Sequence, residues 1–147
     1  MNIEIDQSGK IEQLNCDTII AFSNRKQYAV SLPKPVKRNI FLAYKSQTRQ
    51  LRYKLFCIGI YWCIKDYLSE FSLIIIDCEN KGNETLIKSL LLNLIRIEYK
   101  EFDDKLIRFG QIGKQSNAHN VAIDVFRKHR KPNRIMTISD IESLLRK

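Results

Sequence analysis

Several features of common protein classes are missing from this chain. Its four cysteines include no Cys-X-X-Cys pair, which argues against a zinc site and indicates reduced core residues. Its apolar runs are too short for a membrane-spanning helix, and its first residues lack the basic and apolar regions of a signal peptide. No internal repeat or linker divides it, so we expect one cytoplasmic domain over residues 1–147.

Acidic residues are missing from a long part of the chain. From Thr18 to Lys65, both included, there are ten Lys or Arg residues and no Asp or Glu, and the net charge of the whole chain is +9. Positive charge in this excess favours a polyanionic partner. The expected partner is nucleic acid, with no membrane contact.

β-Branched and periodic apolar segments predict an α/β protein. Strands are expected over residues 2–7, 17–23, 27–32, 71–77 and 106–109, and helices over 37–68, 84–98, 116–130 and 137–147. Ser116 and Ser139 are the expected N-caps of the last two helices. The first three strands are expected to be antiparallel, with a hairpin turn between the second and the third. The nearly all-apolar run at 71–77 predicts a central strand that is buried on both faces.

Two of the predicted strands end on an aspartate. The run at residues 3–6 stops at Asp6 and the run at 73–77 stops at Asp77, while Asp124 lies on the helix at 116–130. A carboxylate at a strand end lies at the sheet edge where ligands of α/β folds bind. Carboxylates that meet there would bind Mg²⁺ or Mn²⁺, which prefer oxygen ligands. We therefore predict that Asp6, Asp77 and Asp124 are catalytic and bind the metal.

The order of these elements resembles the ribonuclease H-like superfamily. Asp6 in Ile-Asp-Gln-Ser-Gly is similar to the first-strand aspartate of that superfamily, and Asp77 in Ile-Ile-Ile-Asp is similar to the acid that ends its fourth strand. The first-helix glutamate of the ribonucleases H proper has no counterpart here. The acid pattern is therefore closest to Holliday-junction resolvases of the RuvC type, whose third acid lies on the last helix.

This resemblance implies a fold and an activity. The fold would be a five-stranded mixed sheet flanked by helices, and the activity would be hydrolysis of phosphodiester bonds with Mg²⁺ or Mn²⁺, with Asp6 bridging two metal ions. Resolvases of this type act as dimers, so a homodimer is to be tested. The Leu-rich segment at 86–95 is apolar over more than one helix face, which a dimer interface and burial within the monomer explain equally well.

The ligand on the last helix has several candidates. Asn117, Asn120 and Asp124 share one polar edge, whereas His119 falls on the opposite border of the buried face. This pattern favours Asp124 as the metal ligand, with His119, Asn120 and Glu79 as alternates. The structural alternative for Asp124 is an ion pair with Lys128 at i+4.

Two groups of basic residues are candidates for nucleic-acid binding. On a continuous helix over 37–68, one stripe would carry Arg38, Lys45, Arg49 and Arg52. A second group follows the helix of Asp124 and contains Arg127, Lys128, Arg130 and Lys131. Either group would bind a phosphate backbone without reading base sequence.

The leading hypothesis is therefore a metal-dependent endonuclease, a hydrolase that acts on structured nucleic acid such as a DNA junction or an RNA/DNA hybrid. The first alternative is a non-catalytic nucleic-acid-binding module on the same fold. A small PIN-like nuclease is a third hypothesis, but its first strand would be followed directly by a helix.

Overall fold

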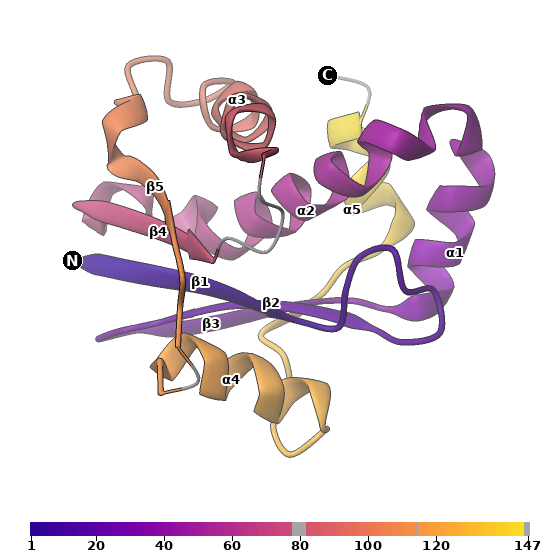
Figure 1. The fold of residues 1–147 in the computed structure, drawn as a ribbon, viewed down its shortest axis with the longest axis horizontal. Helices are drawn as coiled ribbons and strands as arrows, with labels where there is room; N and C mark the ends of the chain where they lie inside the picture. The colour runs from indigo at the N-terminus through magenta and orange to yellow at the C-terminus, as the bar shows by residue number, and fades with distance from the viewer. Residues whose placement is uncertain (78–81, 114, 146–147) are drawn as a thin grey trace.

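The protein has an α/β fold built on one mixed sheet (Figure 1). The computed structural model describes residues 1–77, 82–113 and 115–145, with the side chains of residues 47–49 outside the description. Within these residues the sheet has six strands in the order β5-β4-β1-β2-β3-β6. Their bounds are β1 Asn2–Ser8, β2 Thr18–Ser23, β3 Gln27–Leu32, β4 Leu73–Asp77, β5 Ile107–Gly110 and β6 Arg134–Ile135.

The sheet combines antiparallel and parallel pairs. β1 pairs antiparallel with β2, and β2 with β3, as the sequence predicted. A strand rather than a helix thus follows β1, which argues against the PIN-like hypothesis. β4 lies parallel to β1 on its other side, and β5 lies parallel to β4. The sequence predicted five strands and missed β6, which is two residues long and lies parallel to β3.

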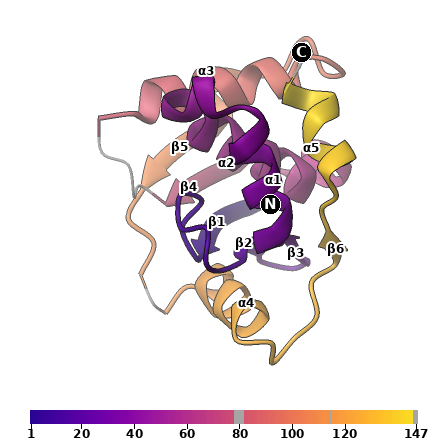
Figure 2. The ribbon, with the colours of Figure 1, turned by 90° about the vertical axis from the view of Figure 1, so that its right-hand side faces the viewer.

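Helices cover both faces of the sheet, but unequally. Their bounds are α1 Lys34–Ala43, α2 Thr48–Ile64, α3 Glu84–Ile95, α4 Asn117–Phe126 and α5 Ile138–Leu145, with 3-10 turns at Lys45–Gln47, Lys65–Glu70 and Asp104–Leu106. Figure 2 shows α1, α2, α3 and α5 on one side of the sheet and α4 alone on the other. α4 packs against β1, β2 and β3.

The unequal cover changes the expectation for β4. Ile74 and Ile76 are buried in the main core, but Leu73, Ile75 and Asp77 are only half-buried. The prediction of a strand buried on both faces is therefore wrong. The reason is that α4 packs on β1, β2 and β3, so among the described residues no helix packs closely on the second face of β4.

The predicted helix over 37–68 is also wrong as a single element. α1 ends at Ala43, a 3-10 turn follows, and α2 begins at Thr48. Tyr44 leaves the helical conformation, and its hydroxyl lies 2.8 Å from a carboxylate oxygen of Glu142 in α5. The break allows α1 to contact α5 while α2 continues across the sheet.

A buried lysine fastens the long β1–β2 connection to α1. The Lys37 ammonium group is fully buried and donates to the carbonyl oxygens of Lys10 and Gln13 and to the Thr18 hydroxyl, at 3.2, 2.6 and 3.0 Å. No carboxylate of a described residue pairs with it. Burial lowers its pKa from the ordinary 10.5.

This burial predicts a specific pH dependence of stability. Because the pKa of Lys37 is lower in the folded state, the unfolded chain binds more protons between that pKa and 10.5. The free energy of unfolding should therefore rise with pH in this window for the wild type and lose this rise in Lys37→Met. Denaturant titrations at several alkaline pH values measure it, with exposed Lys34→Met as the control. An identical pH response in the two variants would contradict the assignment.

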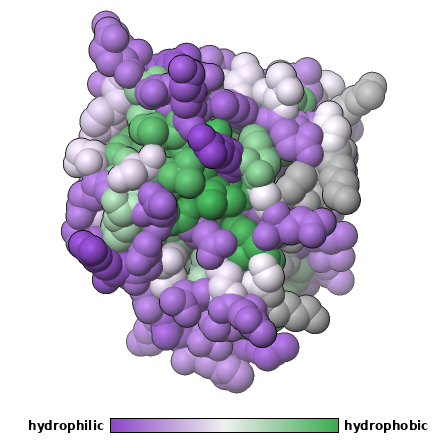
Figure 3. Space-filling view, turned by 60° about the vertical axis from the view of Figure 1, so that its left-hand side comes forward, coloured by the Kyte–Doolittle hydropathy of each residue, from purple (hydrophilic) through white to green (hydrophobic). Residues whose placement is uncertain are grey.

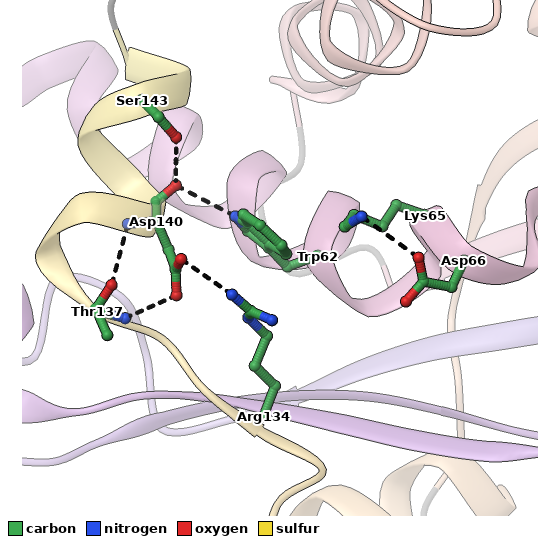
Figure 4. Close-up of polar contacts among 7 residues, drawn as sticks. All are labelled: Trp62, Lys65, Asp66, Arg134, Thr137, Asp140 and Ser143. Atoms are coloured by element: carbon green, nitrogen blue, oxygen red, sulfur yellow. Dashed lines mark hydrogen bonds and ion pairs between the residues drawn. The ribbon is translucent and has the colours of Figure 1, made fainter.

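The C-terminal segment is held on α2 by one polar cluster (Figure 4). The guanidinium carbon of Arg134 lies 4.1 Å from the centroid of the Trp62 ring, and its Nη2 lies 3.0 Å from Asp140 Oδ1. The Trp62 indole N–H donates to the Asp140 carbonyl oxygen at 3.3 Å. These contacts join β6 and α5 to the main core.

Asp140 also begins α5. Its backbone N–H donates to Thr137 Oγ1 at 3.1 Å, and the Thr137 N–H donates to Asp140 Oδ2 at 3.0 Å. Thr137, rather than the expected Ser139, is therefore the N-cap of this helix. Burial raises the pKa of Asp140, but the hydrogen bonds from Thr137 and Arg134 and the charge of Arg134 outweigh it, so that the net pKa is below 3.8.

Removal of the Asp140 carboxylate should loosen the C-terminal segment. Asp140→Ala loses the partner of Arg134 and half of the helix cap, so we expect a loss of about 1–3 kcal/mol in the free energy of unfolding at neutral pH. Because the pKa of Asp140 is lowered in the folded state, this contribution disappears as the pH falls through that value. Thermal and chemical unfolding measure both effects. Ser139→Ala is the control, and an equal loss there would contradict the capping assignment.

Candidate functional site

The first two predicted carboxylates lie side by side. The parallel register of β1 and β4 pairs Ile5 with Ile76, so the next residues, Asp6 and Asp77, stand next to each other on adjacent strands. The buried isoleucines point to the main core, and both aspartates point to the opposite face, on which α4 lies. The two carboxylates influence each other, because the Asp77 charge raises the pKa of Asp6.

His119 from α4 reaches the first of these carboxylates. Its Nδ1 lies 2.8 Å from Asp6 Oδ2, and Asp6 Oδ1 accepts the Gln7 N–H at 2.8 Å. Asp6 is 4% exposed, whereas the His119 side chain is 27% exposed. A carboxylate that holds one ring nitrogen fixes the orientation of the imidazole and leaves Nε2 for another partner.

The start of α4 is fixed on the same strand. Ser116 is the N-cap, as predicted: its hydroxyl oxygen accepts the Ala118 N–H at 3.2 Å and donates to Glu4 Oε1 at 3.1 Å. Glu4 and Asp6 lie on one face because side chains alternate along a strand. Ser116 and His119, one helical turn apart, therefore contact the two acids of β1. The sequence interpretation did not include Glu4 or Ser116 in the site, although this alternation was visible.

Burial dominates the electrostatics of Asp6. It raises the pKa of the carboxyl group above 3.8, and the hydrogen bonds from His119 and Gln7 oppose this effect without cancelling it. The ionised form of Asp6 therefore lowers the stability of the folded chain.

Asp77 is the more accessible of the two carboxylates. It ends β4, is half-buried, and its Oδ1 accepts the Ile112 N–H at 3.0 Å. This bond ties the connection between β5 and α4 to the site. No donor from another described residue contacts Oδ2. Asp77 therefore keeps one oxygen for a ligand.

The structure does not bring the third predicted aspartate to the other two. Asp124 is half-buried on α4, and its side chain makes no hydrogen bond with Asp6 or Asp77. It forms no ion pair with Lys128 either. The side chain of Asn120 is exposed, and Glu79 lies outside the described residues. A role of Asp124 in metal binding stays a prediction.

Metal-binding side chains do not form a larger cluster in the described part of the chain. Residues 1–77, 82–113 and 115–145 contain no group of three or more His, Cys, Asp or Glu side chains arranged to hold a metal ion. Within that part, His119 contacts Asp6, and Asp77 follows the residue that pairs with Ile5 on the adjacent strand. The described cysteines are free, and Cys57 and Cys63 are buried in the main core.

The first predicted basic stripe does not lie on one continuous helix. Arg38 is on α1 and donates to the Leu14 carbonyl oxygen at 2.8 Å, whereas Arg52 is on α2 and stacks on the Tyr53 ring at 4.8 Å. Lys45 lies in the 3-10 turn between the helices, and the side chain of Arg49 is outside the description. Because the helix breaks after Ala43, helical spacing no longer aligns these residues, and their binding of nucleic acid stays a prediction.

The second basic group remains together at the end of α4. Its four predicted members are all exposed: Arg127, Lys128, Arg130 and Lys131. Lys128, Arg130 and Lys131 line a hollow together with Asp17 and Pro33. Arg127 follows His119 by eight residues, which corresponds to about 12 Å along a helix. The group is therefore close enough for one nucleic-acid strand to contact it and the carboxylates.

A second, apolar hollow lies away from the carboxylates. Phe71 and Leu106, which precede β4 and β5, line it together with Phe102 and the half-exposed Tyr99. Figure 3 views the side on which β1 and β4 begin, and apolar side chains gather at its centre with hydrophilic ones around them. Asp6 and Asp77 lie toward the other ends of their strands, so this hollow is not part of their site.

The Leu-rich helix does not need a dimer to bury its apolar residues. In α3 the side chains of Ile87, Leu91, Leu92, Leu94 and Ile95 are buried within the chain itself. Leu86 and Leu90 pack against the same core. Burial in the monomer therefore accounts for the pattern at 86–95, and a homodimer stays a prediction.

Comparison with known proteins gave no significant match to any family model, curated protein or solved structure. Among the described residues, no helix is long and apolar enough to cross a membrane. The arrangement of the site itself is therefore the basis for a functional proposal.

The unfavourable burial of the Asp6 carboxylate predicts that a neutral side chain at this position stabilises the fold. Because the pKa of Asp6 is raised in the folded state, the folded chain binds more protons between 3.8 and that value, and stability falls as the pH rises through this window. Asp6→Asn should therefore melt at a higher temperature than the wild type at neutral pH. The gain should vanish below pH 3.8, where both states are protonated.

Thermal melting over a pH series measures this effect. Asp124→Asn, which replaces a half-buried carboxylate on α4, is the matched control and should show no comparable gain. A lower melting temperature of Asp6→Asn at neutral pH would show that the hydrogen bonds to Asp6 outweigh its burial.

Proposed function

We propose that the protein is a divalent-metal-dependent nuclease that hydrolyses phosphodiester bonds in structured nucleic acid. The observation that carries the proposal is the position of Asp6 and Asp77 on adjacent parallel strands, with His119 on the first of them. Such a pair at the carboxyl ends of parallel strands lies where ligands of α/β folds bind. A DNA junction or an RNA/DNA hybrid is the substrate we propose.

The fold supports the same proposal. Three antiparallel strands come first, a helical region follows, and β4 then ends on Asp77 beside the first strand. This order is similar to that of the ribonuclease H-like superfamily, and we propose that the chain is a member with an additional short strand, β6. The acid pattern favours the resolvases of the RuvC type within it.

The donor set fits Mg²⁺ or Mn²⁺. Mg²⁺ is commonly bound by one or two carboxylates together with substrate phosphates and water, and does not need a cage of protein ligands. Each carboxylate oxygen can accept more than one contact, so the bonds to Gln7 and His119 leave Asp6 able to bind a cation. When bound, such a cation would neutralise the phosphodiester and lower the pKa of an attacking water.

The protein residues have separate parts in this proposal. Asp77 offers an accessible oxygen, and Asp6 offers a second carboxylate that His119 holds in place. His119 presents Nε2 on the side away from Asp6. In this proposal His119, rather than Asp124, is the group that the last helix contributes to the site. The net charge of +9 and the basic group after α4 would attract the substrate.

A non-catalytic nucleic-acid-binding module on the same fold is the second candidate. It is favoured by one observation: the described residues contain no group of three metal-binding side chains. Such a module would bind nucleic acid through its basic surface with a strong dependence on salt, and without a divalent metal.

A cleavage assay with active-site variants tests the proposal. Labelled four-way junction, duplex DNA, single strands and RNA/DNA hybrid are incubated with Mg²⁺, Mn²⁺ or EDTA. We expect metal-dependent cutting by the wild type and its loss in Asp6→Asn and Asp77→Asn, with binding retained. His119→Ala should reduce cutting by about 10–100-fold, since it removes the group that orients Asp6.

Asp124→Asn is the informative control in this assay. Cutting near the wild-type level would favour His119 as the group on the last helix, and a loss as large as that of Asp77→Asn would favour Asp124. Binding of every probe without cutting in any metal would overturn the nuclease proposal in favour of the binding module.

A further inference from the structure

α4 covers only part of the sheet face on which Asp6 and Asp77 lie, so a nucleic-acid strand could contact only the rest of that face. α4 packs on β1, β2 and β3, and Figure 2 shows β4 and β5 lying beyond it. Ile75 and Asp77 are half-buried on this face, where the connection from β5 to α4 reaches Asp77 through the Ile112 N–H. A nucleic-acid strand that reaches the two carboxylates would therefore approach over β4 and β5.

One basic residue stands on this part of the face. β5 pairs with β4 so that Arg108 lies opposite Ile75 and Gly110 lies opposite Asp77. Ile107 is buried in the main core, so Arg108 and Gly110 point to the other face, the face of the carboxylates. Arg108 and Asp77 are therefore diagonal neighbours on that face.

Arg108 has no structural task that accounts for it. Its side chain is exposed, and it makes no hydrogen bond or ion pair with a described residue. Two other arginines are engaged by contrast: Arg96 donates to the Phe102 carbonyl oxygen, and Arg134 binds Asp140. The guanidinium group of Arg108 is therefore available to a ligand.

The residue beside Asp77 places no side chain of its own between Asp77 and Arg108. Gly110 lies opposite Asp77, and a Cβ at this position would lie only 3.3 Å from Ile75 Cγ2, because the Ile75 side chain occupies that place. A substrate strand that passes from Asp77 to Arg108 would therefore lie over the side chain of Ile75.

We propose that Arg108 binds a phosphate of the substrate strand beside the site of Asp6 and Asp77, so that the strand crosses the sheet over β4 and β5. This inference rests on the proposed function and specifies which path the strand takes. Arginine suits the role because its planar guanidinium group binds a phosphate through two parallel hydrogen bonds. Arg108 is a positioning residue here, since it holds the strand and does not touch the reacting atoms.

A solvated arginine on an edge strand is the competing explanation. Charged side chains on edge strands prevent sheets from pairing with one another, and β5 is an edge of this sheet. Such a residue would not change the number of phosphate contacts. The salt dependence of binding therefore separates the two explanations.

The test measures the dissociation constant of the four-way junction and the hybrid from about 50 to about 200 mM salt without divalent metal. Each phosphate contact adds about one to the slope of log K against log[salt], so Arg108→Ala should lower this slope by about one. Arg108→Lys should retain the slope, because it keeps the charge, but bind more weakly. Melting temperatures confirm that the variants are folded.

Arg25→Ala is the matched control. Arg25 is exposed in the β2–β3 turn and lies three strands away from β5. It should leave both the slope and the cleavage rate unchanged, whereas Arg108→Ala should reduce single-turnover cleavage at low substrate concentration more than at saturation.

The outcomes distinguish the two proposals. If the wild type cuts through Asp6 and Asp77 but Arg108→Ala keeps the wild-type slope, the path over β5 is wrong and the nuclease proposal stands. If the wild type binds but never cuts, a lower slope for Arg108→Ala still supports the path, on a binding module. If the wild type binds none of the probes, both proposals fail.

Discussion

The parallel register between β1 and β4 determines the relation between the two carboxylates. Ile5 pairs with Ile76, and both point to the main core, so the following aspartates point together to the other face. A shift by one residue would turn Asp77 into the apolar core and leave an isoleucine beside Asp6. Such a shift would expose the isoleucines of β4, so burial of apolar side chains on one face fixes the polar site on the other.

The position of α4 then gives the two carboxylates different surroundings. Small residues at its contact with the sheet, among them Ala21, Ala29 and Ala122, form an apolar cluster beneath the helix. Asp6 lies at the border of this contact and is buried, whereas Asp77 lies on the neighbouring strand and is half-buried. One carboxylate is thus held rigidly by His119, and the other is accessible to a ligand.

The sequence predicted those parts of the molecule that depend on local pattern. β1, β2, β3, β4 and the Ser116 cap follow from alternation, β-branched runs and capping chemistry, and the structure confirms them. β6 is too short to give a pattern, and it exists because Arg134 and its neighbours are fixed by contacts with Trp62 and Asp140. The break after Ala43 likewise depends on a distant contact, that of Tyr44 with Glu142.

The last helix shows the same limit within the site. Helical spacing correctly separated His119 from Asp124, but it could not tell which border of α4 faces β1. That choice depends on the direction in which α4 lies along the strand, and Ser116 sets it through its bond to Glu4. Similarly, the apolar run at 73–77 has the composition of a doubly buried strand, and only the limited extent of α4 leaves Ile75 partly exposed.

Asp6 is the residue whose presence the fold explains least. Its neighbour on β2 is Ala21 and its neighbour on β4 is another acid, Asp77, so burial and the charge of Asp77 both raise the pKa of the Asp6 carboxyl group. The bonds from Gln7 and His119 reduce this unfavourable effect but do not remove it. An apolar residue would satisfy the packing without these bonds, so packing alone does not explain a carboxylate at this position. Under the function proposed above, its part is to bind a cation together with an anionic substrate.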